Sequence, residues 1–67
     1  MKLERTIEQI RLILQKDRRG LTIQEIAHLT KTSRITAALA LAKLEGAGLI
    51  DVRRIGNCKL HYWRDTR

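Results

Sequence analysis

Apolar residues recur at helical spacing in the first part of the chain. Four of them, separated by four, three and four positions, share one helical face: Leu3, Ile7, Ile10 and Leu14. This stripe predicts a helix from about Leu3 to Lys16, widened by Ile13, with Leu12 outside the stripe. Basic residues and Gly20 follow. They favour an end to the helix, because cations suit the negative end of its dipole and glycine permits a left-handed turn.

A capping box marks the start of a second, shorter helix. The Thr22 hydroxyl can accept a hydrogen bond from the amide of Glu25, whose carboxylate can accept one from the amide of Thr22. Leu21 and Ile26 flank this pair at the positions of a hydrophobic staple. We therefore expect a helix from Ile23 to about Leu29 that buries three apolar residues, namely Ile26, Ala27 and Leu29.

A short polar connection and a longer helix follow. Thr30–Ser33 is rich in hydroxyl side chains, and either Thr32 or Ser33 can cap the next helix by accepting from a free backbone amide. The Ala- and Leu-rich segment predicts a helix from about Arg34 to Gly46. Gly48 supplies the left-handed stop after it.

The hydrophobic period changes after the third helix. Leu49–Ile55 is rich in β-branched residues, and Lys59–Arg64 alternates between polar and apolar. Gly56-Asn57 between them is typical of a tight turn, so the two segments predict a β-hairpin. The fold class is therefore α+β, with three helices followed by a two-stranded hairpin. The chain has no proline, repeat or low-complexity stretch, and we expect residues 1–67 to form a single domain.

This order of elements and several local motifs resemble the winged helix-turn-helix superfamily. The matching segments are Leu21–Ala27, Ser33 and Leu41–Ile50. Ile55–Tyr62 is similar to the wing of small archaeal and bacterial transcription regulators. The resemblance covers nearly the whole chain. It implies that the third helix enters the major groove of duplex DNA and that the hairpin, as the wing, contacts phosphates or the minor groove.

The third helix is unusual for a helix that reads bases. The resemblance implies a core face of Ala37, Ala40, Leu41 and Leu44, and a groove face of Ile35, Thr36, Leu39, Ala42 and Lys43. Three groove-face residues cannot hydrogen-bond a base: Ile35, Leu39 and Ala42. A helix that is apolar on almost every side is more often buried or at an interface. We expect Leu39 to be exposed, because Leu41, Leu44 and Leu49 supply the better core stripe.

The charge of the chain points to an anionic partner. Lys and Arg number 14 against 7 Asp and Glu, which gives a formal charge of +7 and a pI near 10.6. This excess is typical of nucleic-acid binding. Proteins that bind single strands stack bases on several aromatic rings, but this chain has only Tyr62 and Trp63. Duplex DNA is the favoured partner, and we expect both rings to cover the hairpin or the first helix.

Candidate DNA-contacting residues lie at the start of the third helix, along it and on the hairpin. They are Lys31, Thr32, Ser33, Arg34, Thr36, Lys43, Arg53, Arg54 and Lys59. The free amides and dipole at the start of a helix favour a phosphate, and such contacts fix position without reading sequence. Alternatively, Arg53 and Arg54 form a solvated pair, Arg34 is solvated, and Thr36 is a plain exposed threonine.

The remaining reactive residues do not form a recognisable site. Cys58 has no cysteine partner and no metal-ligand cluster around it, so we expect a reduced thiol. We expect His28 and His61 at the surface. The sequence shows no nucleophile–base pair or phosphate-binding glycine loop, so we expect no enzymatic activity and no cofactor. No apolar run approaches about 18 residues, and no signal peptide is evident, so we expect a cytoplasmic protein without membrane contact.

The sequence therefore predicts a small transcriptional regulator that binds double-stranded DNA, or the DNA-binding domain of one. A homodimer on a pseudo-palindromic site is the expected assembly. The alternative is a winged-helix protein-interaction module, in which Ile35, Leu39 and Ala42 dock a partner chain. A role in RNA binding or chromosome architecture is a third reading. The first two differ in what the exposed face of the third helix contacts.

Overall fold

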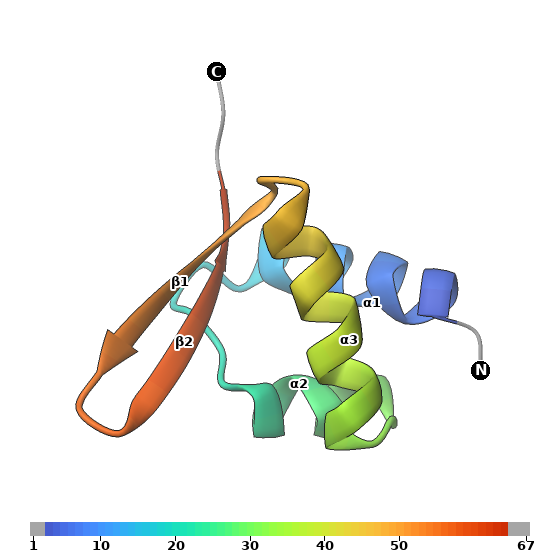
Figure 1. Cartoon of the computed structure of the whole chain (residues 1–67), viewed down its shortest axis with the longest axis horizontal. Helices are drawn as coiled ribbons and strands as arrows, with labels where there is room; N and C mark the ends of the chain where they lie inside the picture. The colour runs from blue at the N-terminus through green and yellow to red at the C-terminus, as the bar shows by residue number, and fades with distance from the viewer. Residues whose placement is uncertain (1–2, 65–67) are drawn as a thin grey trace.

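The computed structural model describes residues 3–64, which form three helices followed by a two-stranded antiparallel sheet (Figure 1). The elements are α1 (Leu3–Lys16), α2 (Ile23–Thr30), α3 (Arg34–Gly46), β1 (Ile50–Ile55) and β2 (Cys58–Trp63). The predicted α+β class and all five elements are confirmed, with boundaries shifted by at most one residue. None of the helices in residues 3–64 has the length and apolar character needed to cross a membrane.

The core lies where α3 packs on α1 and α2, with the hairpin beside α3 (Figure 1). Ile10, Leu14 and Ile26 are fully buried at its centre. The predicted core face of α3 is confirmed, because all four of its residues are buried: Ala37, Ala40, Leu41 and Leu44. Two of the four residues of the α1 stripe, Ile10 and Leu14, are buried, whereas Leu3 and Ile7 are half-buried, and Leu12 is exposed as predicted.

Two leucines predicted to lie in the core are exposed instead. Leu29 is 53% exposed because Thr30 occupies the buried position on α2, where its hydroxyl donates to the Ile26 carbonyl at 2.8 Å. Leu49 is also exposed. It follows Gly48, which has a φ of +75°, and its amide donates to the Leu44 carbonyl at 3.0 Å. This closes α3 in a Schellman motif and leaves Ile50 to fill the core.

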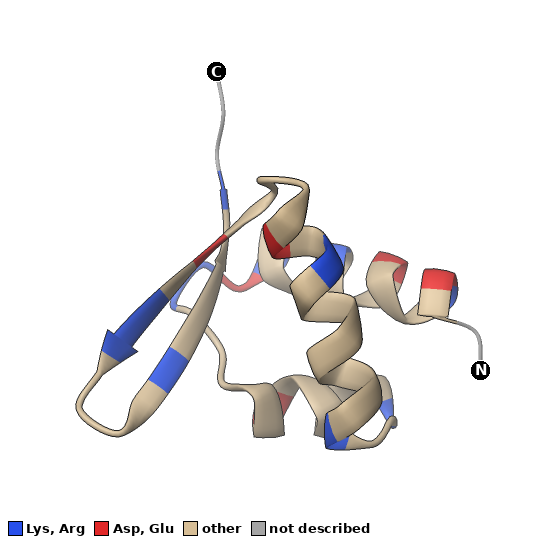
Figure 2. Cartoon of the chain, in the orientation of Figure 1, with Lys and Arg blue, Asp and Glu red and all other residues tan. Residues whose placement is uncertain are grey.

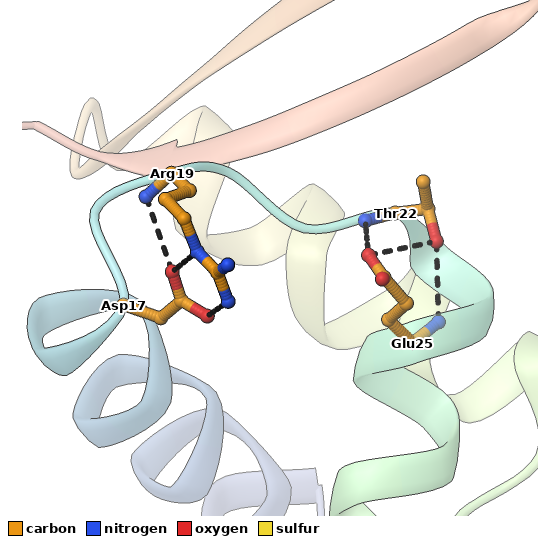
Figure 3. A network of polar contacts seen from close by, with 4 residues as sticks. All are labelled: Asp17, Arg19, Thr22 and Glu25. Carbon is orange, nitrogen blue, oxygen red and sulfur yellow. Dashed lines mark hydrogen bonds and ion pairs between the residues drawn. The ribbon is translucent and has the colours of Figure 1, made fainter.

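Local capping bonds explain where α2 begins. The amide of Glu25 donates to the Thr22 hydroxyl at 3.2 Å, and the amide of Thr22 donates to the Glu25 carboxylate at 2.9 Å (Figure 3). The predicted capping box is therefore confirmed. In the preceding linker, the Asp17 carboxylate accepts from the backbone amide of Arg19 at 3.1 Å and from its guanidinium (Figure 3). These bonds hold the α1–α2 connection in a defined path.

The hairpin has a register that separates two faces. Its ladder runs from the Ile50–Trp63 pair to the Ile55–Cys58 pair, and Gly56-Asn57 forms the two-residue loop. Gly56 has a φ of +60°, as the first central position of a type II′ turn requires. Since strand residues alternate between faces, buried Ile50 marks the face of β1 that lies on the helices.

An isolated β-bridge, which the sequence did not predict, joins Leu21 to the free edge of β2. The backbones of Leu21 and His61 exchange two hydrogen bonds, of 3.1 and 2.8 Å. The predicted surface position of His61 is wrong: the residue is only 7% exposed, and its Nδ1 lies 2.9 Å from the Leu21 carbonyl. A carbonyl only accepts, so Nδ1 carries the proton in this contact. His28 is exposed, as predicted.

The two aromatic residues cover edges of the structure. Trp63 is half-buried against the core. The ring of Tyr62 lies against Gly20, where an added Cβ would stand 2.6 Å from ring atoms. Gly20 also has a φ of +94°, which side-chain-bearing residues rarely adopt. Tyr62 and the α1–α2 linker therefore both require glycine at this position.

We expect Gly20→Ala to lower the free energy of unfolding by about 1–3 kcal/mol, because it adds backbone strain and a collision with Tyr62. Chemical denaturation measures the change. The matched control is Gly46→Ala, at the end of α3, where an added Cβ meets nothing within 4 Å. Alanine there is expected to raise stability by about 0.5–1 kcal/mol. Equal stability of Gly20→Ala and the wild type would contradict this account of the linker.

Candidate nucleic-acid interface

The turn between α2 and α3 is built by hydroxyl side chains. Lys31 adopts a left-handed conformation with a φ of +55°, and the hydroxyls of Thr30 and Thr32 lie 2.9 Å apart. Ser33 caps α3 by accepting from the amide of Thr36 at 3.1 Å. Ser33, rather than Thr32, is therefore the cap. The turn leaves Lys31 exposed, along with Arg34 on the first turn of α3.

Three predicted contact residues meet in a hollow between the hairpin tip and the starts of α2 and α3. This basic hollow has a volume of about 490 Å³ and is lined by Arg34, Arg54 and Lys59 together with Gln24, Asn57 and four neighbouring residues. Arg54 and Lys59 stand directly opposite each other in the ladder. This pair lies four positions along the ladder from the Ile50–Trp63 pair. Because strand residues alternate between faces, Arg54 and Lys59 share the face of Ile50, which is turned toward the helices. No feature of the sequence had indicated that Gln24 and Asn57 belong to this site.

Arg53 lies on the other face of the hairpin. Its guanidinium sits over the ring of Tyr62, 5.9 Å from the ring centroid. Successive strand residues point to opposite faces, so the neighbouring Arg54 points toward the helices and Arg53 away from them. The structure thus places on opposite faces of the hairpin two arginines that the sequence predicted to act as one pair.

Predicted hydroxyl residues gather in a second hollow on the α1 side of α3. This hydroxyl hollow, of about 450 Å³, is lined by Arg5, Gln9 and several threonine and serine side chains, among them Thr32, Ser33 and Thr36. Arg5 and Gln9 belong to α1, in which the sequence predicted no contact residue. They lie beside α3 because of the way α1 packs, and no local sequence pattern indicates that packing.

The outward face of α3 is an apolar ridge formed by Ile35, Leu39 and Ala42. Ile35 is 73% exposed and Leu39 is 46% exposed, and Ala42 is exposed as well. Thr36 and Lys43 lie along the flank toward the hydroxyl hollow, whereas Ala38 and Glu45 line a hollow with Lys59 on the hairpin side. The predicted phase of α3 is confirmed, with Leu39 outside the core.

Cations at the predicted contact positions have no acidic partner. Six of the nine predicted residues are basic, and within residues 3–64 none of the six forms an ion pair: Lys31, Arg34, Lys43, Arg53, Arg54 and Lys59. Figure 2 shows basic residues on both strands of the hairpin and near both ends of α3. The interface region therefore presents positive charge that the fold does not neutralise.

Three acidic residues are paired with arginines that are not among the predicted contact residues. Arg11 binds Glu8, Arg19 binds Asp17 at 3.2 Å, and Arg64 binds Asp51 at 2.9 Å. Hydrogen bonds from Arg11 lower the pKa of Glu8 below its ordinary value. The side-chain and backbone bonds from Arg19 likewise lower the pKa of Asp17. Both carboxylates therefore stay ionised and paired at neutral pH, outside the basic hollow.

Other kinds of site have little support in the described part of the chain. No three His, Cys, Asp or Glu side chains of residues 3–64 are grouped to hold a metal ion. Cys58 is exposed at the hairpin tip beside the basic hollow. Comparison of the chain with protein-family models, curated proteins and solved structures found no significant match.

Proposed function

We propose that this chain is a winged helix-turn-helix protein of the transcriptional-regulator type that binds double-stranded DNA. In this proposal α3 enters the major groove, and the β1–β2 hairpin is the wing on the neighbouring backbone. The α2–turn–α3 unit, with its three-residue turn, and the hairpin that follows it are compatible with that layout. The observation that supports the proposal most directly is the set of unpaired cations around the exposed face of α3.

The opposed pair in the basic hollow favours an anionic ligand. Like charges directly across a ladder destabilise a sheet, yet Arg54 faces Lys59 and neither has an acidic partner in the described residues. Arg34 adds a third cation to the same hollow. A phosphate between them removes the mutual repulsion and gains charge-assisted hydrogen bonds. The hollow is therefore proposed to hold one or more backbone phosphates.

The shape of α3 suits the major groove. An α-helix with its side chains is about 10–12 Å across, close to the roughly 12 Å width of the groove. Short side chains at Ala38 and Ala42 on the exposed side keep α3 narrow. Lys31 and Arg34 lie at its start and Lys43 near its end, so cations border the helix where the two DNA backbones would pass.

Binding to a 20-base-pair duplex is expected to weaken steeply as salt is added. If Lys31, Arg34, Lys43, Arg54 and Lys59 each neutralise one phosphate, the log–log slope is about −4 to −5. Fluorescence anisotropy at several salt concentrations measures it, and a single strand of equal length is the control. Weak single-strand binding is expected, because the chain has few rings on which bases stack. A flat salt dependence, or no duplex binding at low salt, would refute the proposal.

The apolar ridge favours one alternative, a protein-interaction module. Exposed Ile35 and Leu39 are the kind of side chains that anchor a partner helix. However, none of the cations that border the ridge forms an ion pair within residues 3–64, although Glu45 lines a hollow with Lys59. A purely apolar partner would leave those cations without counter-charge, whereas DNA supplies it. We therefore retain DNA as the proposed partner.

A further inference from the structure

We infer that the apolar ridge of α3 recognises the C5-methyl groups of thymines in the major groove, which makes methyl-bearing pyrimidines the specificity element of the target. This inference rests on the proposed DNA binding. Ile35, Leu39 and Ala42 have no donor or acceptor on their side chains, so none of them can pair with a base edge.

The major groove offers one apolar feature to such a ridge. Among the four bases of DNA, thymine alone carries a methyl group there, and apolar side chains contact it. Burying exposed apolar surface on both partners is favourable. Ile35 is 73% exposed and Leu39 is 46% exposed, so both have surface left to bury when a ligand arrives.

The length of the ridge sets how many base pairs it covers. Ile35 and Ala42 are seven residues apart, which corresponds to about 10 Å along a helix. DNA rises about 3.4 Å per base pair on each strand, so the ridge spans about three base pairs. Ile35 lies in the first turn of α3, the part of a recognition helix that usually approaches base edges most closely.

Charge complementarity distinguishes this ligand from another apolar surface. Arg34 stands at the start of the ridge, Lys43 lies on one flank, and Lys59 lies on the hairpin side. A ligand that covers the ridge must therefore bring negative charge on both sides of an apolar strip. A methyl-lined groove between two phosphate backbones has that pattern.

Four 20-base-pair duplexes test the inference by anisotropy with the wild-type chain. The first alternates A and T, and the second replaces every thymine by deoxyuridine, which removes only the methyl groups. We expect about a fourfold loss for each methyl contacted, or about 15-fold for two. The third alternates G and C, and the fourth carries 5-methylcytosine, which restores a methyl in the same position. The fourth is expected to bind more tightly than the third. The salt slope should be equal for all four.

A variant with Ile35→Ser and Leu39→Ser is expected to lose the preference for methylated duplexes and keep the salt slope. Both side chains are exposed, so the fold should persist, and circular dichroism checks it. Salt-dependent binding with equal affinity for the thymine and deoxyuridine duplexes would overturn the inference and leave DNA binding intact. Failure to bind any duplex would overturn both. A dimer in sedimentation that the double variant disperses would assign the ridge to a second copy of the chain.

Discussion

Replacing both Arg54 and Lys59 by alanine is expected to weaken duplex binding about 60-fold at 0.1 M salt. At 0.1 M salt, each phosphate contact raises the duplex affinity roughly eightfold relative to 1 M salt, and the factors for two contacts multiply. The slope of log affinity against log salt should also become shallower by about 2, equally for all duplex sequences. Both side chains line the basic hollow and neither has an acidic partner in the described residues. Anisotropy over a range of salt concentrations provides both quantities.

Two comparisons distinguish direct phosphate contact in the hollow from a general effect of net charge on duplex binding. The double variant Arg11→Ala and Arg19→Ala also removes two positive charges, but from exposed ion pairs outside the hollow. We expect its duplex affinity to stay within about threefold of wild type. Arg53→Ala is expected to cost less than Arg54→Ala, because Arg53 lies over Tyr62 on the other hairpin face. Equal losses in the two double variants would mean that net charge alone drives binding and that the hollow is not a contact.

Leu41→Gln is expected to lower the free energy of unfolding by about 2–5 kcal/mol, whereas Leu39→Gln should change it by less than about 0.5 kcal/mol. The two leucines are two positions apart on α3, yet Leu41 is 4% exposed and Leu39 is 46% exposed. A buried amide loses its water without gaining partners and also leaves packing defects. Chemical denaturation of both variants, at two protein concentrations, measures the difference.

The same pair of variants also reports on assembly. If Leu39→Gln is destabilising only at the higher protein concentration, where copies associate, Leu39 belongs to an interface between chains. If it is strongly destabilising at both concentrations, Leu39 is buried in the core of the monomer and does not lie on the exposed face of α3. On DNA, Leu39→Gln is expected to reduce the methyl preference while leaving the salt slope unchanged, because the phosphate contacts are untouched.

Local signals in the sequence determined the helices and their ends. At the start of α3 the sequence left Thr32 and Ser33 as alternative caps, and the structure has the cap at Ser33. The Thr22–Glu25 capping box and the Gly48 stop each act through bonds between residues three to five positions apart. Such bonds depend on neighbouring residue types alone, so the sequence is sufficient to predict them. The spacing of apolar residues likewise gave the buried face of α3, since a regular helix repeats every 3.6 residues. The Gly56-Asn57 turn fixed the hairpin for the same reason.

Tertiary packing decided which of several suitable residues filled the core. Thr30 is buried and Leu29 exposed, although leucine is the more apolar, because the Thr30 hydroxyl is satisfied by a backbone carbonyl of its own helix. His61 is buried because Leu21, forty residues earlier, supplies both backbone pairing and a partner for its ring. Neither outcome has a local sequence signal.

In the candidate interface too, some features follow from the sequence and others from tertiary packing alone. The sequence identified the basic residues, because charge is a property of each side chain. Strand alternation implied that Arg53 and Arg54 point to opposite faces, but only the docking of the hairpin beside α3 turned Arg54 and Lys59 toward Arg34. Packing of α1 likewise brought Arg5 and Thr36 into the lining of one hollow. The physical reason is that helix caps and turns depend on neighbours in sequence, whereas a shared hollow depends on long-range contacts that the fold alone brings together.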